Sequence, residues 1–146
     1  MKKICDFYCW ETQAPPALEQ QLKAKMEYLI RRKKVRCFRV EYLPGDFYLY
    51  VLRALRELKQ KYSFLSLILT VAPLYLDAFT ATGFLPDFLP YLHAGNKYHT
   101  YYPYWADWEP NYLIVYDPQE SQELQGLLIP PSFPGTTHIH LTDPTK

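Results

Sequence analysis

The sequence alternates between short apolar segments and longer amphipathic ones, and this alternation constrains the fold more than any other feature. The segment SFLSLILTV at 63–71 is almost continuously hydrophobic, which is typical of a parallel strand covered on both faces. Leucines recur at helical spacing in 17–34 and 47–62, which predicts two amphipathic helices. Strands are predicted at 3–10 and 35–43, and the arginines within 35–43 indicate that one of its faces is exposed to solvent.

The same alternation continues through the second half of the chain, where prolines are frequent. It predicts strands and short helices, in the order helix 74–81, helix 86–93, strand 111–118, helix 119–126 and strand 137–142. Strands that alternate with helices form a parallel sheet with helices on both faces. We therefore predict an α/β fold over residues 1–146, a single-domain three-layer sandwich with a mostly parallel sheet of about five strands.

Charge is divided unevenly along the chain, although the net charge is only +1. Up to Tyr62 there are 14 Lys and Arg against 7 Asp and Glu, and from Ser63 onward there are 2 against 8. A basic half and an acidic half predict either a surface for an anionic partner or the pairing of unlike surfaces in an assembly. The alternative is that the two halves mix in space and leave no basic surface.

The densest basic segment lies at the predicted end of the first helix and in the strand after it, with six cations between residues 31 and 39. Successive cations at helix ends are typical of a surface that follows phosphate groups. The predicted nucleic-acid-binding residues are Arg31, Arg32, Lys33, Lys34, Arg36, Arg39, Arg53 and Arg56. The alternative is a solvated surface on which the cations complement the negative end of a helix dipole.

Polar residues follow several predicted strands, and ligands of parallel sheets bind at the carboxyl ends of the strands. Glu11 and Asp117 offer carboxylates for acid–base chemistry, and Thr12 stands beside the first of them. His140 is the second histidine of an HxH pair, which suits phosphoryl chemistry. The candidate catalytic residues are therefore Glu11, Thr12, Asp117 and His140, and the alternative is that the acids only shape turns.

Several familiar motifs are missing from the sequence. It contains no GxGxxG and no GxxxxGK[ST], which disfavours the usual dinucleotide and nucleoside triphosphate sites. Cys5, Cys9 and Cys37 form no CxxC motif and have no fourth zinc ligand at suitable spacing, so buried free thiols are expected. We predict neither a cofactor nor a metal ion.

The segment KYHTYYPYWADWEPNY at 97–112 contains five tyrosines and two tryptophans. Tyr and Trp are enriched at the centres of protein interfaces, from which charged side chains are depleted. The predicted interface residues are Tyr101, Tyr102, Tyr104, Trp105 and Trp108. The alternatives are a lid over a small ligand and a loop that packs on its own sheet.

These observations predict a non-catalytic interaction subunit. Its basic N-terminal half would contact nucleic acid or another polyanion, and its aromatic, acidic C-terminal half would dock a protein partner or a second copy. One alternative is a small α/β enzyme that acts on a nucleotide or phosphoester, and another is a homo-oligomeric adaptor without nucleic acid. No apolar run is long enough to span a bilayer and no signal peptide is evident, so a cytoplasmic protein without a membrane partner is expected.

Overall fold

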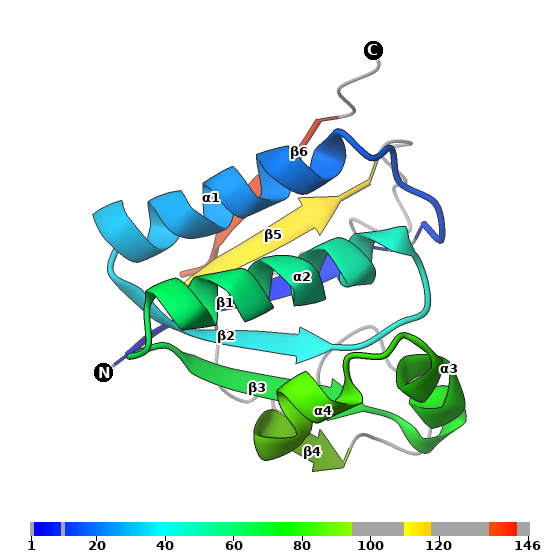
Figure 1. The fold of residues 1–146 in the computed structure, drawn as a ribbon. Helices are drawn as coiled ribbons and strands as arrows, with labels where there is room; N and C mark the ends of the chain where they lie inside the picture. Colours follow the sequence, from blue (N-terminus) through cyan, green and yellow to red (C-terminus); the bar gives the residue numbers. More distant parts are fainter. Residues whose placement is uncertain (1, 10, 95–109, 118–134, 143–146) are drawn as a thin grey trace.

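A six-stranded parallel sheet forms the centre of the protein (Figure 1). The structure is a computed structural model and describes residues 2–9, 11–94, 110–117 and 135–142. The strands are β1 (Lys3–Cys9), β2 (Val35–Glu41), β3 (Ser66–Val71), β4 (Leu92–Ala94), β5 (Tyr112–Tyr116) and β6 (Thr137–Leu141). Their order in the sheet is β4-β3-β2-β1-β5-β6, and every neighbouring pair is parallel.

The α/β class and the parallel sheet predicted from the sequence are confirmed. The helices are α1 (Leu18–Arg32), α2 (Asp46–Lys61), α3 (Leu76–Ala81) and α4 (Leu85–Phe88), with 3₁₀ turns at Pro73–Tyr75 and Leu89–Tyr91. The single helix predicted over 86–93 is wrong, because the chain forms α4, a 3₁₀ turn and then strand β4 there. Pro90 has no N–H to continue the α4 hydrogen bonds. The predicted helix at 119–126 lies outside the described residues.

One face of the sheet packs against α1 and α2, which lie side by side across it (Figure 1). The buried stripe of α1 contains Leu18, Leu22, Met26, Leu29 and Ile30, as its helical spacing predicts. From the sheet, alternate strand residues such as Phe7, Phe38 and Leu69 join the same core. Burial of side chains of this size contributes about 1.5–3 kcal/mol each, so this layer supplies most of the stability.

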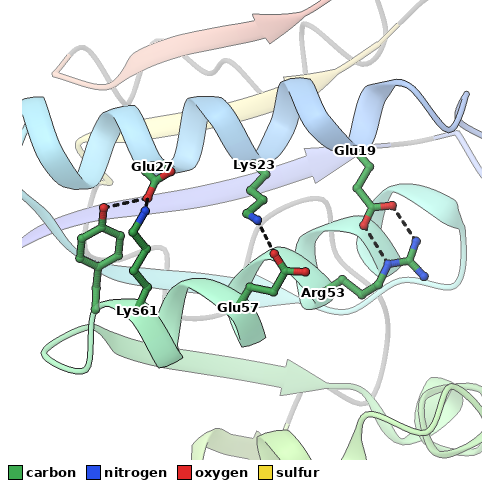
Figure 2. Close-up of polar contacts among 7 residues, drawn as sticks. Glu19, Lys23, Glu27, Arg53, Glu57 and Lys61 are labelled. Carbon is green, nitrogen blue, oxygen red and sulfur yellow. Dashed lines mark hydrogen bonds and ion pairs between the residues drawn. The ribbon is translucent and has the colours of Figure 1, made fainter.

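Three ion pairs join α1 to α2 at successive helical turns (Figure 2). Each pair links residues 34 positions apart, so the two helices run parallel and in register. The pairs are Glu19–Arg53, Lys23–Glu57 and Glu27–Lys61. Charge alternates along each helix, so neighbours four residues apart attract one another as well. We call these six residues the ion-pair ladder.

Exchanging the charges of the central pair tests the ladder. Lys23→Glu and Glu57→Lys alone should each lower the free energy of unfolding by roughly 0.5–1 kcal/mol, because each creates like charges along and between the helices. The double variant should recover only part of the loss, since it restores the cross-helix pair and leaves like charges along each helix. A double-mutant cycle in urea at low salt measures this, and full additivity would contradict it.

The end of α1 contains a residue in an unfavourable backbone conformation. Lys34 has φ of 63°, in the left-handed region that glycine normally occupies after a helix. Lys33 precedes it with ordinary right-handed backbone and donates its N–H to the carbonyl of Leu29. A lysine at this position costs stability that glycine would not.

Lys34→Gly should therefore raise the free energy of unfolding by about 0.5–1 kcal/mol, because it removes the left-handed strain. Lys33→Gly removes the same charge one residue earlier, where φ is −104°, and should give no such gain. Denaturant titration of the two variants measures the difference. Equal effects would show that charge, and not backbone strain, sets the stability at this turn.

Candidate functional site

The topology brings two of the predicted catalytic residues to one point. β1 lies between β2 and β5. The strands that follow β1 in the chain are added first on the β2 side of the sheet and then on the β5 side. Parallel sheets ordinarily bind ligands at such a reversal of strand order. Glu11 follows β1, and Asp117 follows the neighbouring β5. The pKa of the Cys9 thiol is raised to about 12, mainly by burial and in smaller part by the charges of Glu11 and Asp117. Both carboxylates therefore lie near the end of β1, and Cys9 is an unreactive thiol.

The loop after β1 is tied to the loop before α2. The Asp46 N–H donates to the carbonyl of Thr12 at 3.0 Å, and Asp46 Oδ2 accepts the Ala14 N–H at 3.1 Å. The Tyr50 hydroxyl donates to the carbonyl of Ala14 at 2.9 Å. Gly45 has φ of 147°, and a Cβ there would lie 3.1 Å from the Thr12 carbonyl oxygen. This close approach requires glycine, and the contacts hold the backbone of Thr12 in place.

His140 lies apart from the two carboxylates. It stands on β6 opposite Val115 of β5, so β5 separates its strand from β1. Its side chain is exposed, and its ring centroid is 6.5 Å from that of His138 on the same strand face. Partial burial and the neighbouring His140 lower the pKa of His138. Within the described ranges, no three His, Cys, Asp or Glu side chains gather closely enough to hold a metal ion.

The strand face turned away from α1 and α2 contains a buried ion pair that crosses from β1 to β2. Arg39 donates from Nε and Nη2 to the two carboxylate oxygens of Asp6, at 2.7 and 2.8 Å. Arg39 is only 2% exposed and Asp6 4%. Burial raises the pKa of Asp6, and the hydrogen bonds and charge of Arg39 oppose that rise. The solvent-exposed face predicted for 35–43 is therefore wrong, and Arg39 is not available to a surface ligand.

Two further buried polar groups on this face were missed by the sequence analysis. Glu41 and Thr70 lie opposite one another at the ends of β2 and β3, and they are 8% and 0% exposed. Among the residues that the structure describes, Glu41 Oε1 and Thr70 Oγ1 have no hydrogen-bond partner. Burial removes water from the Glu41 carboxylate and raises its pKa to about 7. The charged residues Arg39 and Glu41, two positions apart in β2, were the signal for this buried polar row.

The contribution of Glu41 to stability should be lost as pH rises from about 4.5 to about 7, because the unfolded chain releases the Glu41 proton before the folded protein does. The folded state keeps a proton that the unfolded state releases near the ordinary pKa of 4.5. Glu41→Gln should raise the free energy of unfolding by about 1–3 kcal/mol at pH 8 and leave it unchanged near pH 4.

Glu57→Gln serves as the matched control, because Lys23 lowers the pKa of Glu57. This control should lose stability at neutral pH and not near pH 4, which is the opposite dependence. Urea titrations across the pH range measure both variants. A Glu41→Gln variant without a gain at pH 8 would contradict the buried carboxylic acid.

The predicted nucleic-acid-binding residues divide into three groups. Arg39 is buried, as described above, and Arg36 packs over the Phe64 ring while donating to the carbonyls of Ile30 and Val35. Arg53 and Arg56 lie within α2 and pair with Glu19 and Asp87. The remaining residues, Arg31, Arg32, Lys33 and Lys34, are all exposed.

These four cations lie between the end of α1 and the start of β2, at the side of the sheet where all strands begin (Figure 1). Lys3 lies beside them, because it pairs with Val35 at the start of β2. We call these five residues the basic edge: Lys3, Arg31, Arg32, Lys33 and Lys34. None of the five side chains is in a hydrogen bond or an ion pair with another described residue.

The predicted interface residues Tyr101, Tyr102, Tyr104, Trp105 and Trp108 lie outside the described residues, so their docking role stays a prediction. Cys5, Cys9 and Cys37 are buried free thiols, as expected. In the parts of the chain that the structure covers, no helix has both the length and the apolar character needed to cross a membrane. Comparison of the sequence with protein-family models gave no match, and comparisons with curated proteins and with solved structures gave none either.

Proposed function

We propose that this protein is a non-catalytic interaction subunit that binds nucleic acid or a similar polyanion through its basic edge. The observation that carries the proposal is the contrast between two sets of cations. Arg53, Arg56 and Lys61 each form an ion pair with an acid on a neighbouring element. The five cations of the basic edge are exposed and form no ion pair with a described residue, although the charge of Arg31 acts on Glu27 one helical turn away. A cation without an ion-pair partner can contact a phosphate of a polyanion without breaking an internal pair.

The helix dipole alone does not account for this many charges. It favours cations within the last turn of a helix, each by about 0.3–1 kcal/mol when exposed. Arg31 and Arg32 lie in that turn, whereas Lys33 and Lys34 follow it and Lys3 belongs to β1. Lys34 also occupies a left-handed position where glycine is more stable. A lysine thus stands at a position where its backbone conformation costs stability, which supports a binding role for its charge.

The second part of the proposal concerns protein docking and rests on the sequence alone. The aromatic segment at 97–112 would dock a partner or a second copy, because its Tyr and Trp content is typical of interfaces. Light scattering of the unchanged chain and of a Tyr104→Ala, Trp105→Ala variant tests it. If the unchanged chain and the variant are both monomers, this segment does not dock a second copy.

Salt dependence of binding provides the main test. A labelled oligonucleotide of about 20 residues, single-stranded or duplex, should bind in fluorescence anisotropy at low salt and weaken steeply as NaCl increases. Arg31→Gln, Arg32→Gln together should reduce the slope of log K against log salt by about 2, since roughly one counterion is released per phosphate contact.

The matched control changes two cations on the same helix away from its end. Lys23→Gln, Lys25→Gln removes the same charge from α1 and should leave the slope nearly unchanged. If the control lowers the slope as much as the end variant, net charge and not the basic edge drives binding. Absence of binding at about 25 mM NaCl would refute the proposal.

A second candidate function is a small enzyme that acts on a phosphoester at the carboxyl ends of the strands. It is favoured because Glu11 and Asp117 follow the neighbouring strands β1 and β5, where the strand order reverses. It predicts that Asp117→Asn abolishes hydrolysis of a phosphoester without changing the thermal midpoint. His140, which lies one strand further out and exposed, should then matter less than the sequence pattern predicts.

A further inference from the structure

A cavity of about 440 Å³ lies between α2 and the turn that joins α3 to α4. This volume falls within the range of about 300–1,000 Å³ that is usual for small-molecule sites. Leu49, Ala78, Ala81 and Phe84 supply apolar lining from both sides. None of these residues belongs to the basic edge or to the carboxyl ends of β1 and β5, so the cavity is separate from both candidate sites described above.

The charged groups of this cavity are two arginines one helical turn apart. Arg53 and Arg56 both line it, and no acid is among its described lining residues. Arg53 Nε and Nη2 donate to the carboxylate of Glu19, each at 2.8 Å. The ion pair of Arg56 is looser, with Nη1 at 3.3 Å from Asp87 Oδ2. The side chains of Arg53 and Arg56 remain 43% and 41% exposed, so a ligand can reach both guanidinium groups.

Arg56 also lies close to an aromatic ring of the cavity lining. Its guanidinium carbon lies 5.0 Å from the centroid of Phe84, which also lines the cavity. A guanidinium over a ring face is attracted to the ring and still has N–H groups that can donate to an anion. The geometry thus places an apolar surface and a positive charge next to each other.

The opposite rim of the cavity is a fixed turn. Thr82 Oγ1 donates to the carbonyl of Phe79 at 2.6 Å and accepts the N–H of Phe84 at 3.2 Å. Gly83 has φ of 83°, and a Cβ built there would meet no atom within 4 Å. The backbone of the turn is therefore open to the cavity at Gly83. The hydrogen bonds of Thr82 hold the conformation of the turn in the absence of a ligand. A site that is formed in advance loses less entropy when it binds.

A second, smaller cavity of about 140 Å³ continues on the other side of Arg56. Phe88 and Tyr91 line it together with Lys59, whose ammonium lies 5.9 Å from the centroid of the Tyr91 ring. Asp87 also lines this smaller cavity, where it pairs with Arg56. The larger cavity has two arginines, an aromatic ring and no acid among its described lining residues, and this lining fits a ligand with an anionic head and a flat apolar body.

We propose that this cavity binds a small organic anion, a carboxylate or phosphate attached to an aromatic or apolar group. The anion would accept hydrogen bonds from Arg56 and Arg53, and the apolar body would lie against Phe84, Ala78 and Ala81. Benzoate and phenyl phosphate are suitable probes, because they share the ring and differ in the head group. Benzamide has nearly the shape of benzoate without the charge.

Amide NMR titrations of the full chain test this site. Benzoate or phenyl phosphate should cause saturable shifts at Ala81–Phe84, and benzamide should not. The tighter of the two anions identifies the head group as carboxylate or phosphate. Arg56→Gln should weaken binding about tenfold or more, the loss expected for one charge-assisted hydrogen bond. Lys25→Gln removes an equal charge from an exposed position of α1 outside the basic edge and should leave the affinity unchanged.

Ala81→Leu provides a second test that removes no charge. Leucine is a good helix former and position 81 is exposed, so the variant should fold while its side chain fills the cavity. Binding of both anions should then be lost. Equal binding of benzamide, persistence of binding in Ala81→Leu, or no saturable shift up to about 10 mM of either anion would overturn the proposal.

Discussion

The direction of the chain in a parallel sheet is the constraint on which the rest of this structure depends. Because all strands of the described sheet point the same way, α1 and α2 must run back against them, and both end where the strands begin. Helix dipoles favour cations at that edge and acids at the other. The chain follows this rule with Arg31 and Arg32 at the end of α1 and Lys61 at the end of α2. The sheet topology therefore places the cations at the ends of α1 and α2 on the same side of the molecule.

The two faces of the sheet are stabilised in different ways. The face under α1 and α2 is apolar, and the ion-pair ladder above it fixes how the two helices lie relative to each other. The opposite strand face buries the Asp6–Arg39 pair together with Glu41 and Thr70. Burying such groups costs free energy unless they are fully hydrogen-bonded, and Glu41 is not. Stability is thus concentrated on the helical side.

Periodicity predicted most of the fold, because apolar spacing reports burial directly. It located β1, α1, β2, α2, β3, β5 and β6, and it missed β4, where two prolines interrupt a segment too short to show a period. It did not predict that Arg39 is buried, because alternation identifies two faces and does not tell which of them is covered. The ladder was visible in principle, since charges of opposite sign recur every four residues on both helices. The cavity beside Arg56 depends on how the α3–α4 turn packs on α2, which no local pattern encodes.

The central claim is that a polyanion binds at the edge where the strands begin, opposite the edge that parallel sheets ordinarily use for ligands. An amide NMR titration with a single-stranded oligonucleotide locates the contact most directly. We expect the largest shifts at Arg31–Arg36 and at Lys3, which form or adjoin the basic edge, and little change at Glu11–Ala14 or Asp117. Shifts centred on Glu11 and Asp117 would contradict the account and place the ligand at the carboxyl ends of β1 and β5.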